Sequence, residues 1–265
     1  MYKKKHLLIV ILLNLVFIIQ SYFVLKTRVP VLLFHKIRVD ANDKNQALSN
    51  DFFIKILNFL KKVGYQSFLP NDYIADDDKK VILSFDDGTN DHFKTVMPIL
   101  NVMKQKGLFF WVNNSLIKLS QKEKKELLRV SKDHAIGAHT NKHEIIDSKT
   151  WSNQKIIKEL ESSKRGLESF FKKAIKSFAF AEGIYDKNSL KIAKTIFNYN
   201  FSVEYDYFYP HEKVLHGRMI VFPSTTLNEI SAYLKASKPH KSSSYYFLCF
   251  FIVFFNILFL STKQR

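Results

Sequence analysis

The chain has 265 residues, of which 46% are apolar, so its composition excludes a disordered protein and allows one sizeable domain with appendages. A formal net charge of +17 suggests an anionic partner, but the basic residues are mostly scattered lysines. Arginine, which recognises phosphates and bases through two hydrogen bonds, is scarce, so we expect no nucleic-acid binding. The single cysteine, Cys249, cannot form an intrachain disulfide and does not decide the compartment.

The beginning of the chain predicts a membrane anchor. Residues 7–25 read LLIVILLNLVFIIQSYFVL, which is long enough and apolar enough for a helix to span a bilayer. Lysines precede this run, and they favour a cytoplasmic N-terminus. A cleaved signal peptide is the alternative, but SYFVLKTR contains no small-residue cleavage site. We therefore interpret residues 1–28 as a cytoplasmic tip followed by an uncleaved anchor.

A second apolar run lies near the other end. Residues 245–260 read YYFLCFFIVFFNILFL, and sixteen residues at ~1.5 Å per residue give ~24 Å, slightly less than the ~30 Å hydrocarbon core. We interpret residues 245–265 as a second membrane segment with a short tail, and residues 237–244 as a linker. A helix docked on the domain or lying on the membrane is the alternative. Two spans would place the intervening domain on the extracytoplasmic side of the plasma membrane, although the lysines of residues 235–241 weaken that prediction.

The region between these segments, residues 29–236, predicts one α/β domain. Apolar runs alternate with segments of helical periodicity, which predicts a parallel sheet, open or closed into a barrel, with helices outside it. In such folds functional residues gather at the C-terminal ends of the strands. The predicted strands are residues 29–35, 80–85, 107–112, 135–139, 177–181, 199–203 and 219–222. The predicted helices are residues 51–63, 91–106, 120–129 and 152–173, one from about 188, and one from 226 to about 235. Ser120 with Glu123 and Thr226 with Glu229 are predicted to cap the starts of two of them.

Two polar motifs follow predicted strands. ILSFDDGTND, residues 82–91, places Asp86 and Asp87 before a glycine, which is also ordinary turn chemistry. HTNKH, residues 139–143, places two imidazoles four apart, a spacing that puts them on one face of a helical turn. Solvent exposure explains these histidines equally well when they are taken alone. Two imidazoles with the Asp87 carboxylate form a common catalytic metal set, and Asp86 is then free to act as a base.

SFDDG followed by HTNKH resembles the first two motifs of the polysaccharide deacetylases, the NodB-homology family of metal-dependent carbohydrate esterases. VPVLLFHKI, residues 29–37, is similar to the opening segment of members that act on poly-β-1,6-N-acetylglucosamine, so the resemblance is nearest to that branch. It covers about residues 29–235. It implies an incomplete (β/α) barrel of about seven parallel strands, which the two predicted transmembrane helices would flank.

The resemblance also implies a role for each matched residue. Asp87, His139 and His143 match the ligands of one divalent metal ion, usually zinc and sometimes nickel or cobalt. Asp86 matches the catalytic base, which takes a proton from the water at the metal. The implied reaction removes an N-acetyl group from an amino-sugar glycan of the cell envelope and leaves acetate and a free amine.

The third motif of the family departs from its usual form. Where members often read R-x-P-Y-G, this chain has Ala179 in place of the arginine and Glu182 in place of an aromatic groove residue. A general acid is implied late in the chain, and His216 in VLH is the candidate, with His211 as its rival. The candidates for the substrate groove are Trp111, Glu182, Tyr185 and Arg218.

Two further predictions concern residues near the first motif. His35, in a buried strand, is a candidate for the floor of the site, with a core histidine as the alternative. Asp91 and His92 are expected to cap the next helix.

Three classes of function remain open at this stage. The leading hypothesis is a membrane-anchored, metal-dependent glycan N-deacetylase, and its variant is a deacetylase or deformylase of a lipid-linked sugar. The altered third motif motivates a non-catalytic glycan-binding module on the same fold. The high lysine content motivates a protein that binds nucleic acid or anionic lipid, which we rank last.

Overall fold

All seven predicted strands lie in one parallel sheet. The computed structural model describes residues 28–38, 47–73, 79–210 and 212–237. The order of the sheet is β10-β9-β8-β7-β6-β5-β1-β11, β4 pairs with β5, and every pairing is parallel. The strands are β1 (Val31–Phe34), β4 (Gln66–Ser67), β5 (Lys80–Phe85), β6 (Leu108–Trp111), β7 (Ala135–Ala138), β8 (Ser177–Ala179), β9 (Tyr199–Phe201), β10 (Leu215–His216) and β11 (Met219–Ile220).

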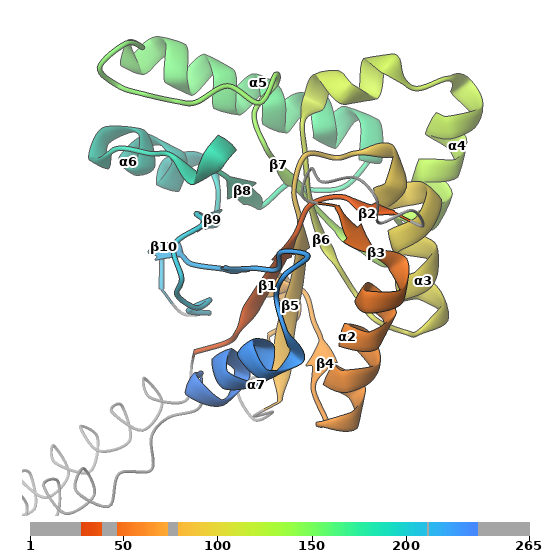
Figure 1. Ribbon diagram of the computed structural model, residues 1–265. Helices are drawn as coiled ribbons and strands as arrows, with labels where there is room; N and C mark the ends of the chain where they lie inside the picture. Colours follow the sequence, from red (N-terminus) through yellow and green to blue (C-terminus); the bar gives the residue numbers. More distant parts are fainter. Residues whose placement is uncertain (1–27, 39–46, 74–78, 211, 238–265) are drawn as a thin grey trace, which may run out of the picture. The chain divides into compact units, whose positions relative to one another are not determined.

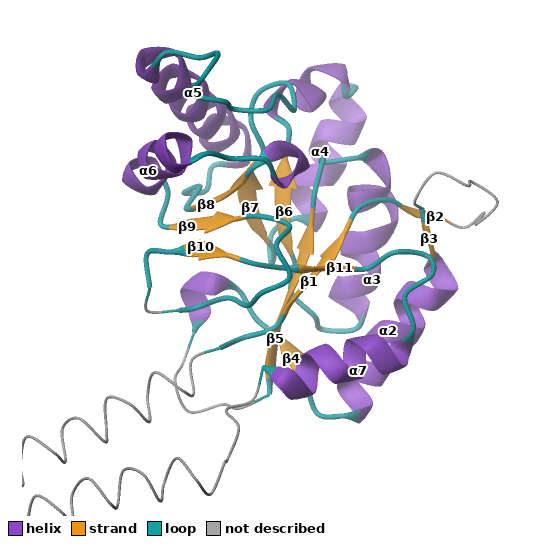
Figure 2. Ribbon diagram, turned by 60° about the vertical axis from the view of Figure 1, so that its left-hand side comes forward, coloured by secondary structure: helices purple, strands orange, loops and turns teal. Residues whose placement is uncertain are grey.

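The sheet is a curled, open half-barrel of nine strands rather than about seven (Figure 2). The two strands missed from the sequence, β4 and β10, have two residues each, which is too short to leave an alternating pattern. Among the described strands, no pairing joins β10 to β11, so the barrel stays incomplete. A separate two-stranded ribbon pairs β2 (Ile37–Arg38) with β3 (Leu48–Ser49).

Helices α2 to α6 lie outside the curled sheet (Figure 1). The α-helices in the described part of the chain are α2 (Asn50–Lys62), α3 (Met97–Val102), α4 (Gln121–Val130), α5 (Asn153–Phe171), α6 (Lys187–Ile196) and α7 (Leu227–Ala236). The capping boxes predicted at Ser120 and Thr226 are both formed. The short helical segments are η1 (Pro70–Asp72), η2 (His92–Val96), η3 (Asn113–Lys118) and η4 (Ala181–Gly183).

The helix predicted over residues 91–106 is shorter than expected. It starts with a wide π turn, η2, and α3 then ends at Val102. Pro98 lies in the first turn of α3, where its missing N–H removes one hydrogen bond of a continuous helix. The change from a π turn to an α-helix at Met97 therefore reflects the presence of Pro98.

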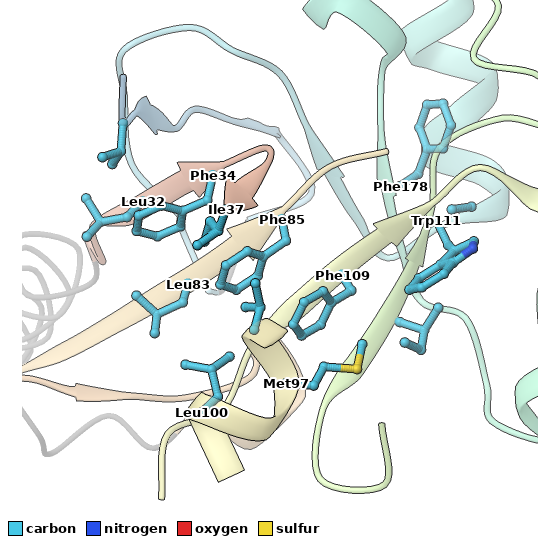
Figure 3. Packing of buried hydrophobic residues seen from close by; sticks show 14 of the residues in the cluster. Leu32, Phe34, Ile37, Leu83, Phe85, Met97, Leu100, Phe109, Trp111 and Phe178 are labelled. Carbon is cyan, nitrogen blue, oxygen red and sulfur yellow. The ribbon is translucent and has the colours of Figure 1, made fainter. Parts of the chain in front are cut away.

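Alternate residues of the strands form two separate layers of core. The outer layer packs Leu83, Phe85 and Phe109 against the helices, and Figure 3 shows Met97 and Leu100 of α3 beside them. The inner layer fills the half-barrel and contains Val31, Ile82, Leu108, Phe110 and Phe201. Because both faces of each strand are covered, the strands read as continuous apolar runs.

The two predicted membrane segments, residues 7–25 and 245–260, lie outside the described residues. Within the part of the chain that the structure describes, none of the helices is long and apolar enough to cross a bilayer. Val29–Ser237 forms one compact unit. The predicted boundaries of the anchor, linker and tail stay predictions.

Candidate metal centre

The two aspartates of the first motif point in different directions because the backbone turns between them. The Asp86 N–H still donates to Phe34 of β1, at 3.1 Å, and continues the ladder of the sheet. Asp87 has a φ of +78° and Gly88 a φ of +64°. A Cβ on Gly88 would lie 2.6 Å from the Trp111 indole, so only glycine fits there. The Asp-Asp-Gly sequence therefore provides both the turn and two carboxylates in separate environments.

Asp87 faces both histidines of the second motif. Its Oδ1 lies 3.3 Å from His143 Nε2 and 3.6 Å from His139 Nε2. One ligand atom from each of the three residues falls within 4.8 Å of the others. Two ligands of a tetrahedral zinc ion, each at ~2.0–2.1 Å, are roughly 3.4 Å apart. The spacing of these three groups therefore fits a shared divalent cation, as predicted for Asp87, His139 and His143.

The orientation of His139 also fits a metal ligand. Its Nδ1 lies 2.8 Å from the carbonyl oxygen of Ala179 at the end of β8, so Nδ1–H can donate to that oxygen. This bond leaves the Nε2 lone pair free and aimed at Asp87. Histidines that bind metals commonly donate their other ring N–H in this way. The ring is 2% exposed, so it has little freedom to turn.

The loop that carries the two histidines is not the helical turn expected from their spacing. Thr140 and His143 both have positive φ, of +62° and +63°. In this conformation the ring centroids of His139 and His143 are 4.8 Å apart. Asn141 anchors the loop to α5, since its backbone N–H and side-chain amide donate to the Glu159 carboxylate at 2.6 and 2.9 Å. Sequence analysis missed Asn141 and Glu159 because their bond joins positions 18 residues apart.

Asp86 is buried and forms an ion pair with Arg218. Both guanidinium NH2 groups donate to the carboxylate, at 2.7 and 2.8 Å, and Nε donates to the Ser202 carbonyl oxygen at 2.7 Å. The Arg218 side chain is fully buried, and its guanidinium lies over the Phe110 ring of the inner core. The prediction that Arg218 lines a substrate groove is therefore wrong. Arg218 places a cation beside Asp86, the predicted base. Ala179, which stands at the arginine position of the third motif, cannot provide that cation.

The surroundings keep both aspartates ionised. Burial alone raises the pKa of each carboxyl, because it removes water from the charged form. At Asp86 the Arg218 charge outweighs burial and holds the pKa below its usual value. At Asp87 the imidazoles of His139 and His143 outweigh burial and lower the pKa of the carboxyl. The pairing with Asp87 in turn raises the pKa of His143.

The other groove candidates lie in three different settings. Trp111 is fully buried in the outer core, where its ring packs against Phe171 of α5, so the groove prediction for Trp111 is wrong. Tyr185 is half-buried, and its hydroxyl donates to the Glu204 carboxylate, which raises the pKa of Tyr185 to about 12. Glu182 is largely exposed and lies beside the metal ligands, with its Oε1 3.7 Å from His143 Nδ1.

The candidate acid His216 lies in the aromatic part of the inner core. Its ring is fully buried against Phe201 and Phe208, and burial lowers its pKa to about 3. The ring is therefore neutral near pH 7, and this environment does not favour the acid role, which stays a prediction. Its rival, His211, lies outside the described residues.

Three residues near the first motif have structural contacts. The Asp91 carboxylate accepts the Ile37 N–H at 2.8 Å and so anchors β2. Its side chain makes no cap hydrogen bond to the next helix, contrary to the prediction. His92 also differs from that expectation, since its ring is buried and its Nε2 lies 2.8 Å from the His35 carbonyl oxygen. Burial lowers the pKa of His35, against the opposing charges of Asp86 and Asp87. The role of His35 at the floor of the site stays a prediction.

Comparison with known proteins agrees with this geometry. A sequence model of the polysaccharide deacetylase family matches residues 74–198, which include both motifs. Residues 74–198 are therefore similar to a polysaccharide deacetylase domain. The Streptococcus pyogenes deacetylase PplD, solved in complex with acetate, superposes with a TM-score of 0.68 at 20% identity over 78% of this chain and 98% of that one. IcaB from Ammonifex degensii gives 0.66 at 20% identity over 79% and 97%.

This chain is also similar to a curated protein, YxkH of Bacillus subtilis (strain 168). The two are 24% identical over 179 residues, which cover 63% of this chain. The chain spans only 61% of the length of that relative. Domains of this family are typical of hydrolases that act on carbon–nitrogen bonds and generally depend on a metal, for which the Asp87 group is the fitting site here. The nearest branch of the family stays a prediction.

Proposed function

We propose that this protein is a metal-dependent N-deacetylase of an N-acetylated amino-sugar glycan. The observation that carries the proposal is the meeting of two groups at the ends of β5 and β7. Asp87, His139 and His143 form a set of ligand atoms within 4.8 Å, and the neighbouring Asp86 is held as a buried carboxylate by Arg218. A pure binding module needs no ionised carboxylate beside its metal ligands, so the geometry favours an enzyme over such a module.

The residues of the chain divide the work of hydrolysis between them. Asp87 and the Nε2 atoms of His139 and His143 would hold the cation, usually zinc in this family. When bound, the cation supplies Lewis acidity, which polarises the amide carbonyl and lowers the pKa of water. Asp86 accepts the proton of the attacking water at a carboxylate oxygen. Arg218 keeps that carboxylate oriented through two hydrogen bonds, while each oxygen retains a lone pair for the proton.

The substrate would be a glycan at the cell envelope, reached from the extracytoplasmic side of the plasma membrane. This part of the proposal depends on the apolar runs of residues 7–25 and 245–260. Support for a glycan comes from the match to the polysaccharide deacetylase family. A lipid-linked sugar is the alternative substrate.

The test uses the full chain, expressed in membranes and purified in detergent. Bound zinc and acetate release are measured with β-1,6- and β-1,4-linked N-acetylglucosamine oligomers. We expect the wild type to bind zinc and release acetate, and Asp86→Asn to keep zinc but lose acetate release by a factor of about 10² or more. Asp51→Asn, in the exposed first turn of α2, is the matched control and should behave as wild type.

Each other outcome has a clear meaning. Zinc binding without acetate release from either oligomer would direct the search to lipid-linked sugars. Release that Asp86→Asn retains would rule out the assigned base. A folded wild type that neither binds zinc nor releases acetate would refute the enzyme proposal and favour the binding module.

A further inference from the structure

The two metal-ligand histidines differ in how their second ring nitrogen is held. His139 is enclosed, and its Nδ1 contacts a backbone oxygen, that of Ala179, at 2.8 Å. His143 is more open, with 32% of its side chain exposed, and its Nε2 faces Asp87 at 3.3 Å. The Nδ1 of His143 lies on the other side of the ring, 3.7 Å from the Glu182 carboxylate. The ring of His143 thus lies between two carboxylates, one at each nitrogen.

Glu182 reaches this position through an unusual backbone conformation. Its φ is +54°, a left-handed value that a glutamate rarely adopts without compensation. Two turn hydrogen bonds hold the segment, from Gly183 N–H to Phe180 and from Ile184 N–H to Ala181, at 3.0 and 3.1 Å. A Cβ on Gly183 would lie 2.2 Å from Val203, so the chain is also confined on that side. The surrounding structure therefore fixes the direction in which Glu182 leaves the backbone.

The partners of both histidines come from one short segment. Ala179 ends β8, and Glu182 follows three residues later in η4. A single segment thus faces both Nδ1 atoms, with a carbonyl oxygen at 2.8 Å from His139 and a carboxylate at 3.7 Å from His143. Carboxylates in this position fix the ring orientation and the tautomer of a metal ligand, and they increase its basicity.

We propose that Glu182 is a positioning residue for the metal ligand His143. Its carboxylate lies 3.7 Å from His143 Nδ1 and, on closing to hydrogen-bond distance, would accept the Nδ1–H and so keep the Nε2 lone pair directed at the cation that Asp87 and His139 would share. The inference rests on the metal site of the proposed function, and it assigns to Glu182 a different task from the groove position that it occupies in the motif. Because the Glu182 side chain is 63% exposed, its pairing should contribute little to folding and mainly affect metal binding.

The test measures binding of Co²⁺ alone to the full chain, without substrate, by the visible absorption of the bound ion. Glu182→Gly removes the carboxylate and suits the positive φ, so the fold should be kept. We expect about 10- to 100-fold weaker Co²⁺ binding than in wild type, with a Tm of the metal-free protein that is no lower than in wild type, because glycine relieves the strain of the positive φ. Glu182→Gln, whose amide oxygen can still accept from Nδ1–H, should bind more tightly than Glu182→Gly. Glu144→Gln, an exposed carboxylate on the same loop as His143, is the matched control and should bind as wild type.

The remaining outcomes separate this inference from the proposed function. Co²⁺ binding by Glu182→Gly within two-fold of wild type would overturn the inference and leave the metal site intact. Loss of an oxygen neighbour of Co²⁺ in the X-ray absorption spectrum of Glu182→Gly would make Glu182 a ligand and would also overturn the positioning role. Failure of the wild type itself to bind Co²⁺ would overturn both this inference and the metal site of the proposed function.

Discussion

Two adjacent carboxylates in this protein have opposite surroundings. Asp86 lies inside the half-barrel, where Arg218 contacts both of its oxygens and the Phe110 ring lies beneath the guanidinium. Asp87 lies at the rim, partly exposed, where it faces the two imidazoles of His139 and His143. The interior pair is already neutralised within the chain, whereas the rim gathers three ligand atoms that a cation would bring together.

The difference teaches that one turn separates a carboxylate held in a buried ion pair from a carboxylate that faces the candidate metal ligands. Of the six non-glycine residues with positive φ in the described part of the chain, four belong to the rim, namely Asp87, Thr140, His143 and Glu182. Backbone strain of this kind costs of order 1–3 kcal/mol for each residue and is concentrated at functional sites. We therefore expect removal of the buried cation Arg218 to cost more stability than changes at the rim, which should mainly alter metal binding.

The largest effect is expected from Arg218→Met. Asp86 would then remain buried without its partner, which costs about 3–5 kcal/mol of unfolding free energy. Urea denaturation at pH 7 measures the loss. Arg165→Met, which breaks the exposed pair with Glu161 on α5, is the matched control and should cost less than about 0.5 kcal/mol. Equal losses of unfolding free energy in the two variants would show that the buried pair stabilises the fold no more than the exposed pair does.

The next effect concerns pH. Burial lowers the pKa of His216 to about 3, from about 6.5 in the unfolded chain. The folded state therefore takes up this proton only at a lower pH than the unfolded state does. The contribution of His216 to stability is complete above pH 6.5 and is lost as the pH falls toward 3. We expect His216→Phe to show a shallower acid dependence of the unfolding free energy, by roughly 3 kcal/mol between pH 6.5 and 4. Parallel curves for the two proteins would contradict this prediction.

A smaller effect is expected at the rim when zinc is added. At a zinc concentration 100 times the Kd, binding to the folded state alone stabilises it by about 2.7 kcal/mol. His139→Gln removes one of the three ligand atoms and should abolish most of this gain. Thermal unfolding with and without zinc measures the difference. A zinc-dependent gain that His139→Gln retains in full would place the zinc elsewhere.

The smallest effect is expected from Tyr185→Phe. The Tyr185 hydroxyl donates to Glu204 at the surface, and exposed polar pairs contribute less than about 1 kcal/mol. We expect an unfolding free energy within that margin of wild type and unchanged zinc affinity, as measured by denaturation and by metal titration. A loss as large as that of Arg218→Met would remove the contrast between rim and interior.

Much of the fold was readable from local pattern. Apolar runs such as residues 80–85 predicted the strands because a strand buried on both faces has no polar side to interrupt it. Caps at Ser120 and Thr226 predicted helix starts because both partners of a capping box lie within four residues. Strands β4 and β10, with two residues each, form only through pairing with distant neighbours, so no local signal marks them.

The sequence by itself indicated the candidate ligand set, because Asp-Asp-Gly and HTNKH follow strands whose C-terminal ends lie at one edge of a parallel sheet. Only the tertiary structure decided which residues support that set. The bond between Arg218 and Asp86 joins positions 132 residues apart, and the proximity of Glu182 to His143 depends on the left-handed turn after β8. The tertiary structure also decided the burial of Trp111 and His216. Their positions in the sequence do not show which side of the curled sheet each side chain faces. Short-range chemistry fixes turns, caps and strand ends, whereas burial and ion pairing depend on the closure of distant segments around each side chain.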